Sequence, residues 1–305
     1  MSFTRDIADY PEGIVLAVDK PWRWTSADVI RKLKYAAIRH FGKKNLKVGH
    51  AGTLDPLATG VLLVCIGNAC KRAQELQDHD KEYIARIRFG ATTPSYDLEK
   101  EVDRRFPYKH ITADAVRAAL PAFLGEQEQV APLFSAKSVD GVRAYELARK
   151  LYKAGNTAAI DAAALETLHR SRITISELEL LDYIEESIGV PEPSLRDPSH
   201  SQRSSSGSGP LPLTRPRVAM GSGTPMLSSA SARIHVADTS GLGLPEATIR
   251  IACSKGTYIR AFARDLGEAL GSGAHLSGLI RSRSGDFTID KALSVEEALA
   301  LLQAE

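Results

Sequence analysis

Residues 48–60 read VGHAGTLDPLATG, and they continue directly into the apolar run VLLVCIG at 61–67. Asp55 is the only acidic residue between Asp28 and Glu75. The glycines permit unusual backbone conformations, and Pro56 restricts the exit from the turn. The stretch therefore predicts a loop that holds one carboxylate in a fixed direction beside a buried strand. The alternative is a turn in which Asp55 bonds its own backbone, as many loop aspartates do.

The surroundings of Asp55 in the sequence bear on its chemistry. Segment 31–47 carries seven Lys or Arg and no acid, and a basic environment keeps a carboxylate ionised. This favours a nucleophilic or charge-stabilising role over that of a general acid, which needs a raised pKa. A carboxylate-dependent hydrolase would need a second acid as proton donor, and 29–74 contains none besides Asp55. The motifs GxxxxGK[ST], GxGxxG, HExxH and GxSxG are also absent.

The overall composition by itself excludes few classes of protein. The chain has 305 residues, 43% of them hydrophobic, which suffices for a substantial core. Its formal net charge is only +2, so the distribution of charge is more informative than the total. The basic segment 31–47 suits a polyanion such as RNA, although a solvated helix face explains it equally well.

The cysteines and the N-terminus indicate a cytoplasmic protein. Cys65, Cys70 and Cys253 form no CxxC pair, and their odd number is typical of reduced thiols. The start of the chain lacks an apolar signal core, and no run reaches the roughly 18 apolar residues that a membrane-spanning helix needs.

Hydrophobic periodicity predicts an α+β fold. Apolar and alternating runs predict strands, and helical spacing with capping residues predicts helices. The expected strands are 13–21, 61–67, 82–90, 174–183 and 247–253, and the alternation in 82–90 places Tyr83 on its buried face. The expected helices begin near Thr25 or Ser26, near Thr112, after the turn at Asp140-Gly141, near Thr257 and at Ser294. Gly42 is the expected end of the first helix, and Ser294 with Glu297 is a capping-box start. The irregular alternation, with hairpin-like turns, favours a mixed, mostly antiparallel sheet flanked by helices.

Composition changes sharply at 186–245, where Ser, Pro and Gly dominate. Such a segment buries too little apolar surface to offset its ordering entropy, so we expect a disordered, low-complexity insertion. Its arginines could contact RNA, but a plain insertion is the favoured interpretation. The folded domain is then divided into a first part, 1–185, and a second part, 246–305.

The stretch GHAGTLDPLATGVLLV closely resembles the catalytic motif of the TruB family of tRNA pseudouridine synthases. Three further stretches resemble TruB segments in the same order: KEYIARIRFGATTPSYD (81–97), LFSAKSVDGVRAYELAR (133–149) and CSKGTYIRAFARDLGEALGSGAHLSGLIRSRSG (253–285). The resemblance covers 13–183 and 246–288. It implies the pseudouridine-synthase fold, with both parts of the folded domain forming one catalytic domain.

The resemblance also implies an activity. TruB enzymes are isomerases that convert a T-loop uridine of tRNA, uridine 55 in tRNA numbering, to pseudouridine. The glycosidic bond breaks, the uracil turns within the site, and a bond forms to C5. The target nucleotide must be flipped out, because a stacked base is inaccessible. The implied enzyme uses no metal and no cofactor, takes the T-arm of tRNA as its partner, and is expected to be a monomer.

Site residues follow from the matching positions. Asp55 corresponds to the catalytic carboxylate, and the resemblance leaves open whether it adds to the sugar or removes the 2′ proton. Tyr83 corresponds to the active-site tyrosine, which stacks on uracil and can move the proton at C5. Arg260 corresponds to the arginine that pairs with the catalytic aspartate, and a guanidinium can hold both carboxylate oxygens.

Four further positions match substrate-binding residues of the family. His50 corresponds to a histidine that holds the target nucleotide flipped out. Tyr258 lines the uracil pocket, and Leu279 closes over the base. Lys20 matches a lysine near the active site with a less defined role. Without the motif, each would be read as an ordinary surface, core or turn residue.

The chain departs from the family pattern in two ways. The usual PPxFSAxKxxG loop has Ala131 in place of its first proline and Ser138 in place of its lysine, while Lys137 lies one residue early. In an extended segment such a shift turns a side chain to the opposite face. Too few residues follow Phe287 for the C-terminal PUA domain of many relatives. A tRNA-binding folding chaperone with little or no catalysis is therefore the alternative function, although a binding module needs no lone carboxylate.

Overall fold

The computed structural model describes residues 3–135, 137–139, 142–187 and 234–303. Within these residues, seven strands form a continuous path in the order β1-β3-β12-β4-β11-β10-β7, and β2 and β13 pair with β3 and β12. The strands are β1 (Ile14–Lys20), β2 (Val48–Ala51), β3 (Ala58–Ile66), β4 (Lys81–Phe89), β7 (Gly125–Gln129), β10 (Ser171–Ser187), β11 (Leu244–Cys253), β12 (Ala274–Ser284) and β13 (Phe287–Thr288). Every neighbouring pair in this sheet is antiparallel except β12 with β3. The predicted mixed, mostly antiparallel α+β fold is confirmed.

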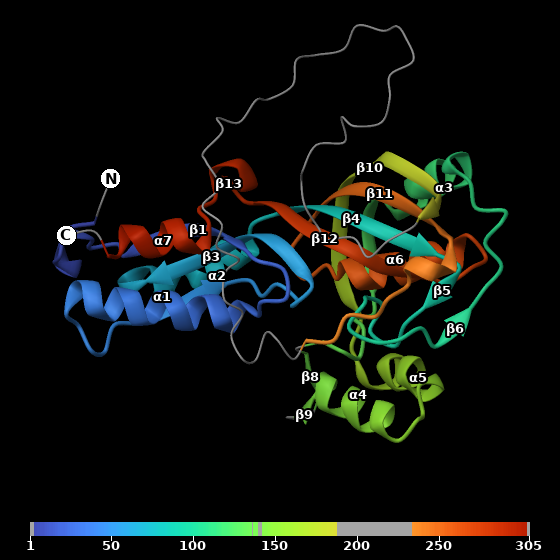
Figure 1. The fold of residues 1–305 in the computed structure, drawn as a ribbon, viewed down its shortest axis with the longest axis horizontal. Helices are drawn as coiled ribbons and strands as arrows, with labels where there is room; N and C mark the ends of the chain where they lie inside the picture. Colours follow the sequence, from blue (N-terminus) through green and yellow to red (C-terminus); the bar gives the residue numbers. More distant parts are fainter. Residues whose placement is uncertain (1–2, 136, 140–141, 188–233, 304–305) are drawn as a thin grey trace, which may run out of the picture.

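The helices flank this sheet at separate places. They are α1 (Ser26–Phe41), α2 (Ala73–Asp78), α3 (Ala113–Ala119), α4 (Ala144–Lys153), α5 (Ala158–Thr167), α6 (Ile259–Ala269) and α7 (Val295–Leu301). Figure 1 shows α1 and α7 beside β1 and β3, while α6 lies by β12 at the other end of the sheet. Helices α4 and α5 share a smaller apolar cluster that includes Ala148, Ile160 and Ala164. None of the described helices is long and apolar enough to cross a membrane.

The start, the end and the buried face of helix α1 are all determined by its local sequence. Thr25 caps it, and the side chain of Asp28 returns a hydrogen bond to the Thr25 backbone, forming a capping box. Gly42 ends the helix with a φ of 61°, a left-handed conformation that glycine adopts readily. Val29, Leu33 and Ala37 are fully buried at helical spacing, so one face of α1 packs on the core.

The parallel contact between β3 and β12 fixes the catalytic-motif loop to the centre of the sheet. Gly60 pairs with Arg281 across these strands. A Cβ at Gly60 would lie 2.3 Å from the Arg281 carbonyl oxygen, and the φ of Gly60 is 101°. Only glycine suits such a close backbone approach in that conformation.

The predicted insertion, 186–245, lies mainly outside the described residues. Its two ends are described, and both belong to the folded domain. Strand β10 continues to Ser187, which pairs with Leu244 of β11. Ala237 and Thr239 are buried against the domain. Composition alone could not place the second end, because Ala237 and Thr239 are held by Leu98 and Arg88, which are distant in the sequence.

Candidate active site

Asp55 lies in the loop between β2 and β3, and the loop is tied down on both sides of it. The Leu54 amide donates to Ser26 Oγ at 3.0 Å, and Ser26 Oγ donates back to the Leu54 carbonyl. The Ala58 amide donates to the Asp55 carbonyl at 3.1 Å, which closes the turn. The carboxylate itself is bonded to Arg260 and is about 39% exposed. It therefore faces outward from a rigid loop.

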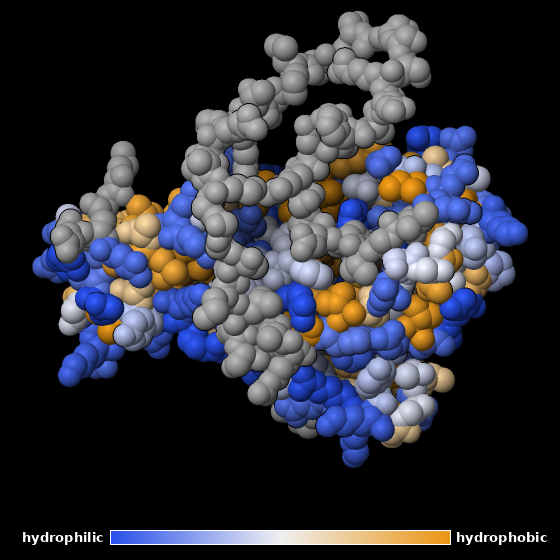
Figure 2. All heavy atoms as spheres, in the orientation of Figure 1, coloured by the Kyte–Doolittle hydropathy of each residue, from blue (hydrophilic) through white to orange (hydrophobic). Residues whose placement is uncertain are grey.

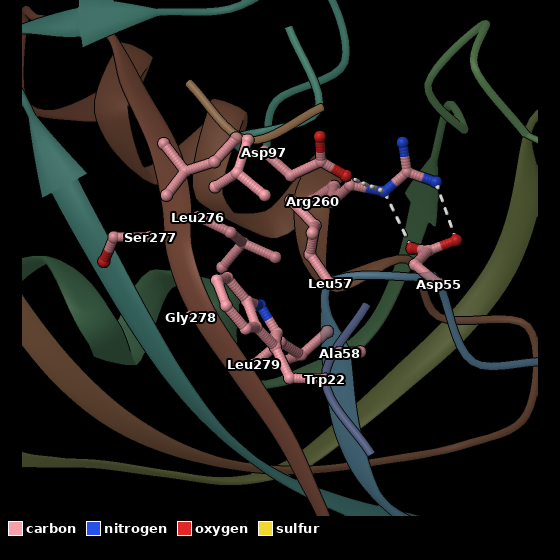
Figure 3. Close-up of a pocket in the computed structure, with 12 residues that line it drawn as sticks. Trp22, Asp55, Leu57, Ala58, Asp97, Arg260, Leu276, Ser277, Gly278 and Leu279 are labelled. Atoms are coloured by element: carbon pink, nitrogen blue, oxygen red, sulfur yellow. Dashed lines mark hydrogen bonds and ion pairs between the residues drawn. The ribbon is translucent and has the colours of Figure 1, made fainter. Parts of the chain in front are cut away.

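Arg260 holds both oxygens of Asp55. Its Nε donates to Oδ2 at 2.9 Å and its Nη2 to Oδ1 at 3.2 Å (Figure 3). The same guanidinium donates to the carbonyls of Ser95 at 3.0 Å and Phe134 at 2.9 Å. Arg260 stands at the start of α6 and is buried, so its planar fork has little freedom to move.

Asp97 is a second carboxylate at this guanidinium, and sequence reasoning did not assign it a role. Its Oδ2 lies 3.6 Å from Arg260 Nε. Its Oδ1 accepts from Ser95 Oγ at 2.6 Å and from the Glu99 amide at 2.9 Å. Figure 3 shows Asp55 and Asp97 approaching Arg260 from different sides. Asp97 ends the stretch 81–97, where it is the one acidic residue after Glu82, which is the signal that could have indicated it.

Burial and neighbouring charges shift the pKa values of Asp97 and Arg260 in opposite directions. Burial raises the pKa of Asp97, and the Arg260 cation opposes that rise. Burial alone would lower the pKa of Arg260, but the carboxylates of Asp55, Asp97 and Glu99 together raise it above its ordinary value. The guanidinium therefore stays charged, and it supplies the counter-charge for Asp55.

Lys20 is hydrogen-bonded to the loop that carries Asp55. Its side chain is fully buried, and Nζ donates to the carbonyls of Trp24 at 2.5 Å, Pro21 at 3.1 Å and Pro56 at 3.3 Å. Burial lowers the pKa of Lys20 to about 7, and the nearby Asp55 carboxylate opposes this. Lys20 thus joins the β1–α1 loop to the residue that follows Asp55.

The two tyrosines predicted for the site lie on different elements near Asp55 and Arg260. Tyr83 is on β4, 9% exposed, and burial raises its pKa. Tyr258 precedes α6, and burial raises its pKa as well. The Gln129 side chain fixes Tyr258, accepting from its amide at 2.8 Å and donating to its carbonyl at 3.2 Å. Both phenols are therefore neutral at ordinary pH.

A pocket opens beside the carboxylate, and Leu279 is part of its wall. Leu279 lies on β12 and pairs with Ala58 of β3. Figure 3 shows most of the lining residues, which are Trp22, Asp55, Leu57, Ala58, Asp97, Leu98, Val236, Arg260, Leu276, Ser277, Gly278 and Leu279. Apolar side chains thus meet the charged groups of Asp55, Asp97 and Arg260 at this pocket.

His50 lies on β2 and is outside the lining of this pocket, as are Lys20, Tyr83 and Tyr258. Burial lowers its pKa, and the Arg281 cation lowers it further, so the ring is neutral at pH 7. Its Nδ1 is buried and has no hydrogen-bond partner among the described residues.

Arg281 is a buried cation that sequence reasoning missed. Its Nε donates to the Val61 carbonyl at 2.7 Å, and its Nη2 donates to the Gly52 carbonyl at 3.1 Å. It therefore joins β12 to the residues just before and after the catalytic-motif loop. Strand β12 is buried along most of its length, so no alternation of polar and apolar residues marks Arg281 as inward-facing.

The basic segment 31–47 does not supply the counter-charge of Asp55. Lys34, Lys44 and Lys47 line a separate open groove with Asn45 and Cys70. Figure 2 shows hydrophilic side chains over much of the end of the molecule where α1 lies. The carboxylate is instead matched by Arg260, about two hundred residues away in the sequence.

Lys137 takes a defined position although it lies one residue early in its motif. Its Nζ donates to Ser171 Oγ at 2.5 Å and lies 6.0 Å from the centre of the Tyr258 ring. Ser138 belongs to the short strand β8 (Ser138–Val139), and its side chain is outside the described residues. Among the residues that the structure covers, no group of three or more His, Cys, Asp or Glu could hold a metal ion.

Comparisons with known proteins identify the family that this chain resembles. The model of the TruB family pseudouridylate synthase (N terminal domain) matches residues 39–190. The tRNA pseudouridine synthase B of Phocaeicola vulgatus is 44% identical over 288 residues, covering 94% of this chain and 92% of the relative. That of Thermus thermophilus is 38% identical over 282 residues, covering 92% of this chain and 76% of the relative.

Solved structures share the fold at lower identity. A chain of a Cbf5–Nop10–Gar1 complex is 22% identical with a TM-score of 0.55, and the match covers 97% of this chain and 56% of that one. A chain of an H/ACA RNP bound to a substrate RNA containing 2′-deoxyuridine is 20% identical with a TM-score of 0.53, covering 98% and 57%. The present chain thus spans little more than half of these solved chains.

Proposed function

Because the chain belongs to the TruB family of pseudouridylate synthases, we propose that it isomerises the T-loop uridine of tRNA, uridine 55 in tRNA numbering, to pseudouridine. One observation carries the proposal beyond family membership: a carboxylate on a rigid loop, held by both oxygens at the edge of a pocket whose other lining residues are mostly apolar. The named relatives are tRNA pseudouridine synthases.

Asp55 is the reactive group in this proposal. The C1′–N1 bond of the uridine breaks, the uracil turns, a C1′–C5 bond forms, and the hydrogen of C5 is replaced while N1 gains one. Asp55 either adds to the sugar or removes its 2′ proton, and an ionised carboxylate can do both. Arg260 fixes the direction of the oxygens, and such positioning is worth orders of magnitude in rate.

In this proposal each of the remaining site residues has its own contact with the substrate. Neutral Tyr83 stacks on the uracil and carries the proton at C5. Tyr258 and Leu279 bound the base, and neutral His50 holds the target nucleotide out of the T-loop stack. Lys20 acts through the loop, because its Nζ binds the Pro56 carbonyl 3.3 Å away.

The proposed RNA surface extends from the pocket to the groove lined by Lys34, Lys44 and Lys47. Strand β2 connects the two, since Val48 and Gly49 line the groove and the strand leads into the Asp55 loop. Phosphates of the T-arm would meet the lysines there, and such contacts supply sequence-independent affinity. The proposed enzyme is a cytoplasmic monomer that needs no metal or cofactor.

The test is to map the product. An unmodified tRNA transcript is incubated with the protein and every pseudouridine is located. A matched transcript carries cytidine in place of the T-loop uridine. The proposal expects one pseudouridine, at the T-loop position, in the first transcript and none in the second. Pseudouridine at other positions only would contradict the proposed substrate. Binding of both transcripts with no pseudouridine would favour the alternative, a tRNA-binding folding chaperone.

A further inference from the structure

Residues 234–239, which we call the rim segment, pass beside the Asp55 pocket. Val236 lines this pocket together with Trp22, Leu98 and Asp55. The rim segment comes from beyond β10 in the sequence, and none of the catalytic motifs contains it. Its place at the pocket is therefore not explained by the roles assigned to Asp55, Tyr83 and Arg260.

One end of the rim segment is fixed to the β1–α1 loop. Arg23 Nη2 donates to the Ile234 carbonyl at 2.9 Å, although 211 residues separate the two positions. Arg23 has a φ of 62°, a conformation uncommon for residues other than glycine. Trp22, its neighbour, forms part of the pocket wall, so this anchor adjoins the pocket directly.

The other end is fixed to the loop that carries Asp97. The Ala237 amide donates to the Leu98 carbonyl at 2.7 Å. Beyond it, Arg88 Nη1 donates to Thr239 Oγ1, and both side chains are buried. Val236 thus lies between two anchored positions of the chain, Ile234 and Ala237.

The residues that surround Val236 point to the kind of ligand. Trp22, Leu57, Leu98 and Leu279 are the pocket's apolar lining residues, and Asp55, Asp97 and Arg260 are its charged ones. A nucleoside has apolar faces and polar edges, which match this combination of side chains.

We propose that the rim segment is a wall of the nucleotide pocket, with Val236 in contact with the flipped-out nucleoside and Arg23 as the positioning residue that holds the segment in place. This inference rests on the proposed function, because it takes the target uridine as the occupant. It adds Val236 and Arg23 to the determinants of substrate binding.

Kinetics on a T-arm hairpin test the proposal with three variants. Val236→Trp places a larger side chain in the pocket, and this variant is expected to lower kcat/KM at least tenfold. Arg23→Gly removes the anchor and relieves the positive φ, so it is expected to raise KM severalfold without lowering Tm. Its single-turnover rate at saturating protein should stay within twofold. Asp238→Asn is the matched control, because Asp238 is exposed on the same segment and its side chain accepts from the amide of Ser240, two residues further on.

Photo-crosslinking gives a second readout that does not need turnover. A hairpin with 4-thiouridine at the target position is irradiated on the protein, and the crosslinked peptide is identified. A crosslink within 234–239 is expected. The proposal is overturned if no crosslink falls there, if Val236→Trp and Arg23→Gly both keep kcat/KM within twofold of the unchanged protein, or if Arg23→Gly raises kcat/KM. Absence of pseudouridine with the unchanged protein would instead refute the proposed function, and the crosslink would still decide the position of the wall.

Discussion

Arg260 donates two hydrogen bonds to Asp55, from Nε to Oδ2 at 2.9 Å and from Nη2 to Oδ1 at 3.2 Å. The two residues are 205 positions apart, on α6 and on the loop between β2 and β3. A lone carboxylate in a basic stretch of sequence therefore has its partner on a distant helix. Both carboxylate oxygens are bonded, so the direction of this carboxylate is fixed in the folded protein.

Arg260→Lys should lower the single-turnover rate of pseudouridine formation by at least about 100-fold, since small misplacements of a reacting group cost rate on this scale. An ammonium keeps the charge but cannot hold two oxygens in one plane. Rapid-quench assays with excess protein would measure the rate. Arg264→Lys, one turn along α6, is the control and should retain most of the rate. Equal rates in both variants would contradict the positioning role.

Gly60→Ala should lower the free energy of unfolding by roughly 2 kcal/mol or more, because left-handed backbone and overpacking both carry a cost. The added Cβ would meet the Arg281 carbonyl at 2.3 Å. Gly49→Ala is the control from the same motif, because nothing lies within 4 Å of a Cβ there. Urea unfolding of the two variants would compare them. Indistinguishable midpoints would show that β3 and β12 do not approach as closely as described.

Lys20 predicts a pH dependence of stability. Its pKa is about 7 in the folded protein against an ordinary value of 10.5, so between these values the unfolded chain holds a proton that the folded chain has lost. Stability therefore rises with pH across this window, by up to about 1.4 kcal/mol per unit for one proton. Relative to Lys20→Met, the unchanged protein should gain stability from pH 7 to pH 9. Urea unfolding at each pH measures the difference, and a flat difference would contradict the lowered pKa of the buried Lys20.

The groove lysines predict a salt effect on tRNA binding. Replacing Lys34, Lys44 and Lys47 by alanine should weaken binding and reduce the slope of log affinity against log salt by about 2, since each phosphate contact contributes roughly 0.7 to 0.9. The control replaces the exposed Lys109 and Lys291, which lie outside the groove. Filter binding at several salt concentrations gives both slopes. A slope unchanged by the groove substitutions would place the RNA elsewhere.

Local sequence signals predicted much of the fold. Thr25 and Gly42 bound α1 as expected, and the Ser294–Glu297 capping box begins α7. These features depend on neighbours in the chain, which periodicity and capping rules describe. The alternation at 82–90 also predicted which face of β4 carries Tyr83 inward.

Long-range contacts were harder to predict. The pairing of Arg260 with Asp55 was expected only from the family resemblance, because no local rule links residues so far apart. Arg281 was missed because β12 is buried on both faces, which leaves no alternation to detect. Val236 was missed because the residues around it have the composition of a loop, and its contacts with the pocket depend on Arg23 and Leu98.

The most direct test of the central claim is the single-turnover rate of pseudouridine formation by Asp55→Asn on an unmodified tRNA transcript, with binding of the same transcript measured in parallel. Asparagine keeps the size of the side chain but cannot act as a nucleophile or base. We predict full conversion by the unchanged protein and none by the variant, with binding affinities within about threefold, because Asp55 is one partially exposed group. Conversion by Asp55→Asn at a rate close to that of the unchanged protein would contradict the account.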